Sequence, residues 1–275
     1  MVGVILSRQA NLDYPELLVE LTACFSKKGM QVLLFALHDY SELDAVLEKV
    51  LQYQVDGIVV TTTLTPTQMK TINLAGKPIV FYLCSPVDQP FNAAICNDRE
   101  GEQWLVEQLI AGGHRRFGIV SGPSETDVSN ARVADIVEIL EGHKITNVPT
   151  VSCDFSYEGS RRAFRELMAT VGSAPDAVIA INDGVAIGCI DEAVIGFGLR
   201  VPEDLSIVGF DGVIPSKYKL YDLTTWRLPT HRLADAAASM LVDRIEHPDV
   251  PSEQRVFSGD PVPGSSARIP ANRKK

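Results

Sequence analysis

The chain has 275 residues, of which 45% are hydrophobic and 22% are charged, and its formal net charge at pH 7 is −10. The length suits two lobes of ordinary size better than one core, and the composition is that of a folded globular protein rather than a disordered one. The excess of acidic residues argues against direct nucleic-acid binding by this chain, because phosphate contacts need a basic face.

The cysteines and the first residues bear on the cellular compartment. The five cysteines are odd in number, lie in apolar surroundings and form no Cys-x-x-Cys pair, which predicts reduced core residues in a cytoplasmic protein. No apolar run reaches about 18 residues, so we expect no transmembrane helix and no membrane partner. The start, Met-Val-Gly-Val-Ile-Leu-Ser, lacks a basic region and is typical of a strand, so no signal peptide is predicted.

Short β-branched segments alternate with longer segments of helical period along most of the chain. The expected strands span 2–6, 32–36, 57–61, 79–82, 94–96, 117–121, 150–153, 177–181 and 206–210. The expected helices lie near 14–28, 41–53, 66–75, 99–112, 130–141, 157–171 and 184–197. This alternation predicts an α/β protein with parallel sheets covered on both faces, as in two Rossmann-like lobes.

Several helix ends carry recognisable signals. Thr65-Pro66 is a helix start, with a capping side chain followed by proline at the first helical position. Lys27-Lys28-Gly29 is a helix stop, because cations in the last turn and a following glycine both favour termination. We expect helices to end in the same way at Gly112, Gly142, Gly172 and Gly198.

The end of the chain departs from the alternation. A short strand at 224–226 leads through Pro229 to a helix at 230–246 and then to a strand at 254–258. We interpret these segments as two further crossings between lobes, in addition to one near Asn97-Asp98. The expected division is 1–98 plus 229–255 for the N-terminal lobe, and 99–228 plus 256–275 for the C-terminal lobe, with three crossovers at the hinge.

Enzyme motifs are absent from the chain. It has no Gly-x-Gly-x-x-Gly, Walker loop, His-Glu-x-x-His or Gly-x-Ser-x-Gly motif. Ser216 and Lys219 match Ser-x-x-Lys without its companion motifs, and the five histidines lack metal-ligand spacing. We therefore expect no enzyme, no catalytic residue, no metal and no cofactor. His114-Arg115-Arg116 could bind phosphate, although a solvated loop explains these residues equally well.

Polar residues at the carboxyl ends of parallel strands remain as candidates, because ligands of open parallel sheets bind at that edge. Carboxylates and amides bind hydroxyl groups, arginine offers a fixed fork of donors, and an aromatic ring covers an apolar ring face. This mixture suits a small polyhydroxylated or heterocyclic ligand enclosed between lobes. The candidates are Asp13, Tyr14, Arg132, Phe155, Asn182 and Asp211, with Asn97-Asp98 at the first crossing.

Each candidate also has a structural alternative. Asn182 or Asp183 could cap the following helix, and Asp211 could simply form a turn. Arg132 could lie on the surface of a helix. Tyr14 and Phe155 could be core or rim aromatics.

Long segments of the chain resemble the LacI/GalR family of transcription regulators. They lie at 2–5, 55–60, 112–123 (Gly-Gly-His-Arg-Arg-Phe-Gly-Ile-Val-Ser-Gly-Pro), 131–132, 177–188, 198–211 (Gly-Leu-Arg-Val-Pro-Glu-Asp-Leu-Ser-Ile-Val-Gly-Phe-Asp) and 223–229. The resemblance runs from residue 2 to about 269 and implies a periplasmic-binding-protein-like fold. It also implies effector contacts at Arg132, Asn182 and Asp211, surrounded by Asp13, Tyr14 and Phe155.

The chain departs from the family pattern at four places. The family's N-terminal helix-turn-helix and hinge helix are absent, which favours a truncated effector domain over a regulator that makes no DNA contact. The usual Asp-Asn at the crossing is Asn97-Asp98, with the two residues in reversed order. Leu83 stands where relatives often have a polar contact, and Leu228 replaces a frequent glutamine.

The function implied by the resemblance is the ligand-sensing core of a LacI/GalR-type regulator. A small effector, a sugar or sugar derivative, would control operator binding by the full-length dimer, and operator DNA would be contacted only through the missing N-terminal domain. The helix after Asp13 and the 215–223 segment would form the homodimer, unless Ile214, Tyr218, Leu220 and Tyr221 pack within their own lobe. The alternatives are a sugar-binding protein of a transporter and, more remotely, an enzyme using Asp13 and Asp211 as an acid/base pair.

Overall fold

The computed structural model describes residues 1–7, 14–37, 40–84, 91–170 and 174–270. The chain divides into two units. Among the described residues, unit 1 comprises 1–7, 14–37, 40–84, 91–96 and 229–257, and unit 2 comprises 97–170, 174–228 and 258–270. The chain therefore passes between the units after Cys96, after Leu228 and after Phe257. The prediction of a two-lobed α/β fold is confirmed.

Unit 1 is built on a six-stranded sheet in the order β11-β5-β4-β3-β1-β2, in which every neighbouring pair is parallel. The central strands are almost entirely apolar because both of their faces are buried; Gly57–Val60 is an example. The strands are β1 (Val2–Ser7), β2 (Val32–Leu37), β3 (Gly57–Val60), β4 (Ile79–Tyr82), β5 (Asn92–Cys96) and β11 (Gln254–Phe257).

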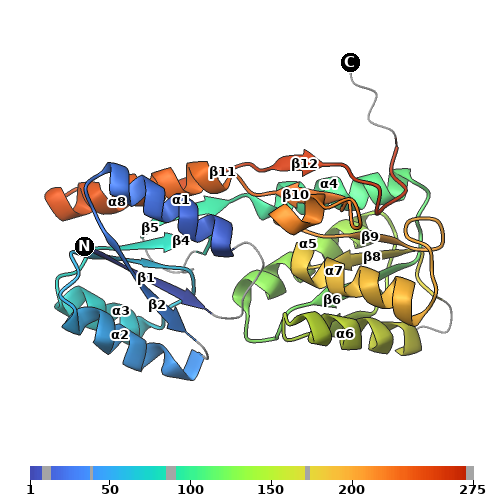
Figure 1. Cartoon of the computed structure of the whole chain (residues 1–275), viewed down its shortest axis with the longest axis horizontal. Helices are drawn as coiled ribbons and strands as arrows, with labels where there is room; N and C mark the ends of the chain where they lie inside the picture. Colours follow the sequence, from blue (N-terminus) through green and yellow to red (C-terminus); the bar gives the residue numbers. More distant parts are fainter. Residues whose placement is uncertain (8–13, 38–39, 85–90, 171–173, 271–275) are drawn as a thin grey trace, which may run out of the picture. The chain divides into compact units, whose positions relative to one another are not determined.

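Helices cover both faces of this sheet (Figure 1). On one face, α1 (Tyr14–Lys27) packs against α8 (Thr230–Glu246), and α8 also contacts the central strands. On the other face lie α2 (Leu43–Gln52), preceded by a 3₁₀ turn at Tyr40–Glu42, and α3 (Pro66–Leu74). The core between α2, α3 and the sheet contains Val46, Leu47, Ile58, Ile72 and Phe81 among others.

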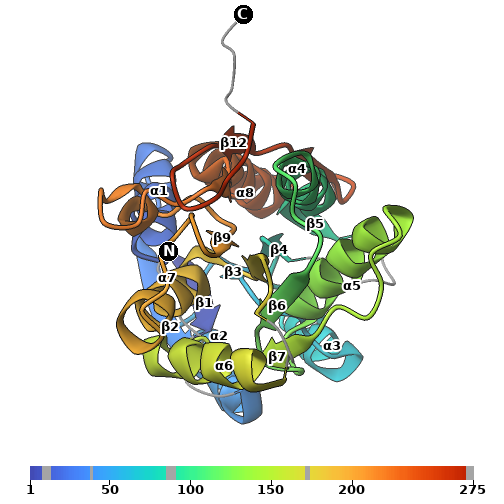
Figure 2. The same ribbon diagram turned by 90° about the vertical axis from the view of Figure 1, so that its right-hand side faces the viewer.

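Unit 2 has a four-stranded parallel sheet in the order β7-β6-β8-β9. Helices α4 and α5 pack together, as do α6 and α7, and the two pairs flank the sheet (Figure 2). A separate antiparallel pair joins β10 to β12. The elements are α4 (Asp98–Ala111), β6 (Phe117–Ser121), α5 (Asp127–Gly142), β7 (Thr150–Ser152), α6 (Tyr157–Thr170), β8 (Ala177–Ala180), α7 (Asp183–Asp191), β9 (Ser206–Val208), β10 (Thr225–Arg227) and β12 (Asp260–Val262).

The helix-start prediction at Thr65-Pro66 is confirmed. The Thr65 hydroxyl oxygen accepts a hydrogen bond from the Gln68 backbone amide at 3.3 Å, and the Gln68 side-chain oxygen accepts one from the Thr65 backbone amide at 2.9 Å, which completes a capping box. The helix-stop predictions hold only in part. Gly29 and Gly198 adopt a positive φ, as expected for a left-handed cap, but Gly112 stays in the right-handed region and Gly113 takes the positive φ instead. Gly142 is the last residue of α5, and the positive φ after this helix, 64°, belongs to Lys144 instead. Gly172 lies outside the described residues.

The structure differs from the sequence-based prediction at three further places. The strand expected at 206–210 ends at Val208, and the Gly209 amide donates to the carbonyl of Thr224, just before β10. The helix expected at 184–197 is α helix only to Asp191 and continues as a π-helical segment, Glu192–Gly196. Strand β12 was not predicted, since its three residues include Pro261. No helix among the described residues is long and apolar enough to cross a bilayer.

Candidate effector site in unit 2

Arg132 is the centre of the polar cluster that the sequence placed at the carboxyl ends of the strands of unit 2. Its Nε lies 2.8 Å from Oδ2 of Asp98, at the start of α4, and its Nη1 lies 3.2 Å from Oδ1 of Asp211. The same Nη1 donates to the carbonyl of Ile181 at 3.1 Å. Only 8% of Arg132 is exposed, so the alternative of a surface helix residue is wrong.

The surroundings of Arg132 stabilise its positive charge. The ring of Phe210 lies 4.1 Å from the guanidinium carbon, a cation–π contact. Burial alone lowers the pKa of this guanidinium, but the charges of Asp98 and Asp211 outweigh burial and hold the pKa above its ordinary value. Arg132 is therefore a fixed cation whose orientation is set from three sides.

Asp211 is held by its backbone as well as by Arg132. Its amide donates to the Trp226 carbonyl at 2.8 Å, and its own carbonyl accepts from the Leu228 amide at 3.0 Å. Its φ of 105° lies in a region that L-residues rarely adopt, and Gly212 follows with a φ of 70°. Asp211 thus pairs with Arg227 in an isolated β-bridge rather than simply forming a turn, and it presents a buried carboxylate to Arg132.

Asn182 caps α7. Its side-chain oxygen accepts a hydrogen bond from the Val185 amide at 2.8 Å, so the capping alternative is confirmed. Its role toward an effector stays a prediction.

Asp183 is completely buried next to Asn182. Its carboxylate accepts from the Thr225 hydroxyl at 2.6 Å and from the Val213 amide at 2.8 Å. Burial, reinforced by the nearby charge of Asp211, raises the pKa of Asp183 to about 8. Asp183, at the start of α7, is therefore hydrogen-bonded both to β10 and to the segment that follows Asp211.

Phe155 follows β7 with a φ of 60°. Its ring packs over the backbone of Gly122, where a Cβ would lie 2.1 Å from Cζ of the ring. This close approach requires glycine at position 122. The structure thus leaves Phe155 half-buried beside the loop after β6.

The two site residues predicted near the start of the chain cannot be placed in this cluster. Asp13 lies outside the described residues, and Tyr14 is described only as the first residue of α1. At the chain crossing, Asn97 is exposed and makes no capping hydrogen bond, whereas Asp98 is the ion-pair partner of Arg132. The effector contacts predicted for all six residues remain predictions.

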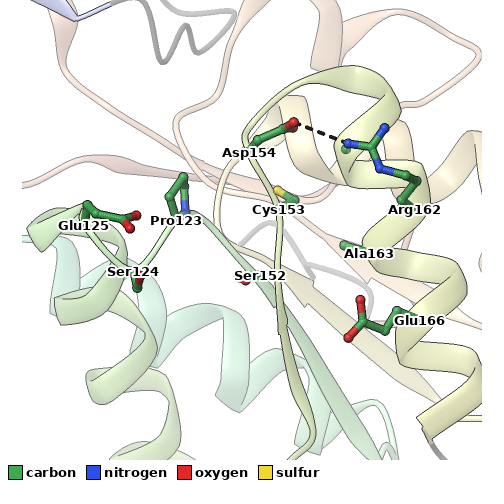
Figure 3. Close-up of a pocket in the computed structure, with 10 residues that line it drawn as sticks. Pro123, Ser124, Glu125, Ser152, Cys153, Asp154, Arg162, Ala163 and Glu166 are labelled. Carbon is green, nitrogen blue, oxygen red and sulfur yellow. Dashed lines mark hydrogen bonds and ion pairs between the residues drawn. The ribbon is translucent and has the colours of Figure 1, made fainter. Parts of the chain in front are cut away.

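A separate cavity of about 480 Å³ lies between the loop after β6, the end of β7 and α6 (Figure 3). Its lining includes the carboxylates of Glu125, Asp154 and Glu166, and Asp154 pairs with Arg162 at 3.3 Å. Cys153 also contributes, but burial raises the pKa of its thiol and so disfavours the nucleophilic thiolate. Arg132, Asn182 and Asp211 do not line this cavity.

Among the described residues, no group of three or more His, Cys, Asp or Glu side chains has the arrangement of a metal site. The expectation for residues 114–116 is only partly right. Arg115 and Arg116 are exposed, whereas His114 is buried and bridges the Leu109 carbonyl (2.7 Å) and the Ser206 hydroxyl (2.8 Å). His114 thereby connects the end of α4 to β9.

Sequence reasoning missed Phe210, Asp183 as a buried acid, Thr225 and Glu102. Phe210 and Asp183 each stand beside a residue that was chosen, so the strand ends indicated them. Glu102 follows Asp98 by four residues and Gly101 by one, a helical spacing that places both carboxyls on one face of α4. Nothing in the sequence indicated that this face is buried.

The chain matches the model of the periplasmic binding protein-like domain over residues 106–267, which is more than half of its length. It is 32% identical over 228 residues to the HTH-type transcriptional repressor PurR of Escherichia fergusonii, an alignment that covers 81% of this chain and 66% of the repressor. The PurR of Klebsiella pneumoniae is 31% identical over 229 residues, with the same coverage. The chain thus spans slightly less than two thirds of these relatives.

Solved structures have the same fold. A complex of the transcriptional regulator CelR with cellobiose superimposes with a TM-score of 0.86 at 22% identity, covering 97% of this chain and 84% of that one. A LacI family transcriptional regulator from Enterococcus faecium with bound ribose gives a TM-score of 0.86 at 23% identity, covering 98% and 99%. The chain therefore belongs to the periplasmic binding protein-like family, as a member of its LacI/GalR branch.

Proposed function

We propose that this chain is the effector-binding domain of a transcription regulator of the LacI/GalR type, and that its effector is a sugar or a sugar derivative. The supporting relatives are named as transcriptional repressors, and two structural neighbours hold cellobiose and ribose. These names favour a regulator over the binding protein of a transporter and over an enzyme. Such a regulator would act in the cytoplasm, and operator binding would belong to the full-length protein.

The observation that carries this proposal is the pairing of Arg132 with Asp211 at the carboxyl end of the unit 2 sheet. A guanidinium and a carboxylate side by side offer donors and acceptors together, which is what vicinal hydroxyl groups need. We propose that these two residues bind the effector, with Phe155 and Asn182 beside them. Asp13 and Tyr14 are proposed as further contacts.

A thermal-shift screen of the chain with ribose, cellobiose, ribose 5-phosphate and guanine tests the proposal first. A compound that raises the unfolding temperature then goes to calorimetry with Asp211→Asn. Loss of a hydrogen bond to a charged group costs about 1.5–3 kcal/mol, so we expect binding at least tenfold weaker. Asp260→Asn, which changes an exposed carboxylate on β12, is the matched control and should bind like the wild type.

The structure changes which substitution at Arg132 is informative. Removing one partner of a buried ion pair costs about 3–5 kcal/mol of stability, so Arg132→Ala would weaken folding as well as binding. Arg132→Lys is the more informative variant, because it keeps the positive charge and loses only the planar, forked set of guanidinium donors. If no compound in the screen stabilises the chain, or if Asp211→Asn binds as well as Asp260→Asn, this assignment fails.

We also propose that the chain forms a homodimer through the helix after Asp13 and the 215–223 segment. Ile214, Tyr218 and Leu220 expose 52%, 55% and 79% of their surface, whereas Tyr221 is half-buried and reaches Asp191 at 3.3 Å. Leu220→Asp should convert a dimer to a monomer in sedimentation velocity. Leu74→Asp is the matched control, because Leu74 is also 79% exposed but lies on α3. A dimer that survives Leu220→Asp would contradict this interface.

A further inference from the structure

Glu102 is a buried carboxyl group without a hydrogen-bond donor. Only 1% of it is exposed, and neither carboxyl oxygen accepts a hydrogen bond from a described residue. The other deeply buried acids of unit 2 are satisfied: Asp183 by Thr225 and Val213, and Glu192 by Arg161 at 2.9 Å. An ionised carboxylate in the position of Glu102 would be costly to bury.

The groups that face Glu102 come from the helices beside it. Asp98 precedes it by one turn on α4, and α5 contributes Arg132 and Asp135. Arg132 is already shared between Asp98 and Asp211. Asp135 is paired with Arg99, which also binds Glu138 at 2.8 Å.

The remaining neighbours of α4 are β10 and β12, whose charged residues are Arg227 and Asp260. They add no donor to Glu102. At Gly101, the residue directly before Glu102, Trp226 of β10 packs so closely that a Cβ would lie 2.4 Å from its ring. The backbone beside the buried carboxyl group is therefore tightly packed.

Burial raises the pKa of Glu102 to about 8. The charge of Arg132 acts in the opposite direction, while the charges of Asp98 and Asp135 raise the pKa further. At neutral pH the group therefore carries a proton.

We propose that Glu102 is a proton-bearing positioning residue for Arg132. While Glu102 holds its proton, Arg132 is shared by two carboxylates, Asp98 and Asp211. When the proton leaves for the solvent, a third carboxylate faces the guanidinium and competes with Asp211 for it. Effector affinity would then fall as the pH rises through the titration of Glu102. This consequence rests on the proposed function, because it needs Arg132 to bind the effector.

The coupling is measurable without any effector. The Nε resonance of Arg132, identified by its loss in Arg132→Lys, can be followed by NMR from pH 6.5 to about 9.5. We expect it to titrate with a midpoint near pH 8 in the wild-type chain, where the pKa of Glu102 lies. In Glu102→Gln this titration should be absent. In Asp135→Asn, which removes a charge that raises the pKa of Glu102, its midpoint should move to lower pH.

Two further variants keep the test decisive. Glu107→Gln, on the exposed side of the same helix, should leave the titration unchanged. Glu102→Met replaces the carboxyl by an apolar side chain of similar length and should also abolish it, should Glu102→Gln fold poorly. A purely structural role for Glu102 predicts an Arg132 resonance that is flat with pH in the wild type, or one that titrates equally in Glu102→Gln and Glu102→Met. Either result overturns the proposal.

A binding measurement separates this proposal from the function on which it rests. With ribose as the probe, calorimetry should show affinity falling severalfold between pH 7 and about 9 in the wild type and staying constant in Glu102→Gln. If ribose binds but its affinity is equally pH-dependent in both proteins, the positioning role fails and the sensor function stands. If ribose does not bind, the Arg132 titration alone decides the role of Glu102.

Discussion

The hydroxyl of Thr225 donates to Oδ1 of Asp183 at 2.6 Å, and both side chains are fully buried. This single contact joins β10 to the start of α7, directly behind Asp211. Because the Asp183 carboxyl is fully buried, no water molecule can take the place of the Thr225 hydroxyl as hydrogen-bond donor if that hydroxyl is removed.

Thr225→Val should therefore destabilise the chain by about 1–3 kcal/mol, the usual cost of leaving a buried acceptor unpaired. Thr225→Ser keeps the hydroxyl and should lose less. Urea unfolding at pH 7 measures both variants. Equal stability of Thr225→Val and Thr225→Ser would show that the hydrogen bond contributes nothing to folding.

Asn182 offers a test that separates capping from ligand binding. Asn182→Ala removes the hydrogen bond to the Val185 amide and should cost about 0.5–2 kcal/mol. Asn182→Ser retains a capping oxygen and should unfold at nearly the wild-type denaturant concentration. If Asn182→Ser is as unstable as Asn182→Ala, the cap is not the stabilising element.

His114 should make the chain acid-sensitive. Burial lowers the pKa of this imidazole in the folded state, so the unfolded chain binds more protons between the lowered pKa and the ordinary value of about 6.5. The stability contributed by neutral His114 is complete above pH 6.5 and is lost as the pH falls. Thermal unfolding between pH 5 and about 7.5 should show the advantage of wild type over His114→Gln shrinking toward the acid end. His143→Gln changes an exposed histidine and should show no such trend; the same trend in His143→Gln would contradict the assignment.

Gly101 should not tolerate a side chain. A Cβ there would lie 2.4 Å from Trp226, and overpacking of this kind costs about 1–3 kcal/mol. Gly101→Ala should lower the unfolding midpoint and change the tryptophan fluorescence, since the rings of Trp104 and Trp226 lie 6.1 Å apart. Gly142→Ala, where no atom lies within 4 Å of the new methyl, should stabilise slightly. A neutral Gly101→Ala would mean that Trp226 can move aside.

Most strands and helices could be predicted from the sequence because each has its own local pattern of residues. The β-branched segment at 177–181 and the capping pair Thr65-Pro66 depend on neighbours within a few residues, and both appear as predicted. Strand β12 contains Pro261 and exists only because β10 lies beside it. Such a strand leaves no local signal.

In the candidate site, too, the residues with a local sequence pattern were predicted and those that depend on tertiary packing were not. Asn182 and Asp211 stand directly after strands, so periodicity located them. The partner of Arg132 could not be found locally, because Asp98 lies 34 positions away and reaches it only through the packing of α4 on α5. Glu102 is a charged residue on a predicted helix, and sequence reasoning places such residues in solvent.

The tie between Asp211 and Leu228 runs from carbonyl to amide, so no side chain takes part in it. Every amino acid except proline carries the required N–H, and the family's frequent glutamine at position 228 can therefore be exchanged for leucine without releasing Asp211. Leu228 is buried, so variation at this position changes the local packing without breaking this hydrogen bond. A proline at 228, or a change in the number of residues between 211 and 228, would break it and release one of the constraints on Asp211.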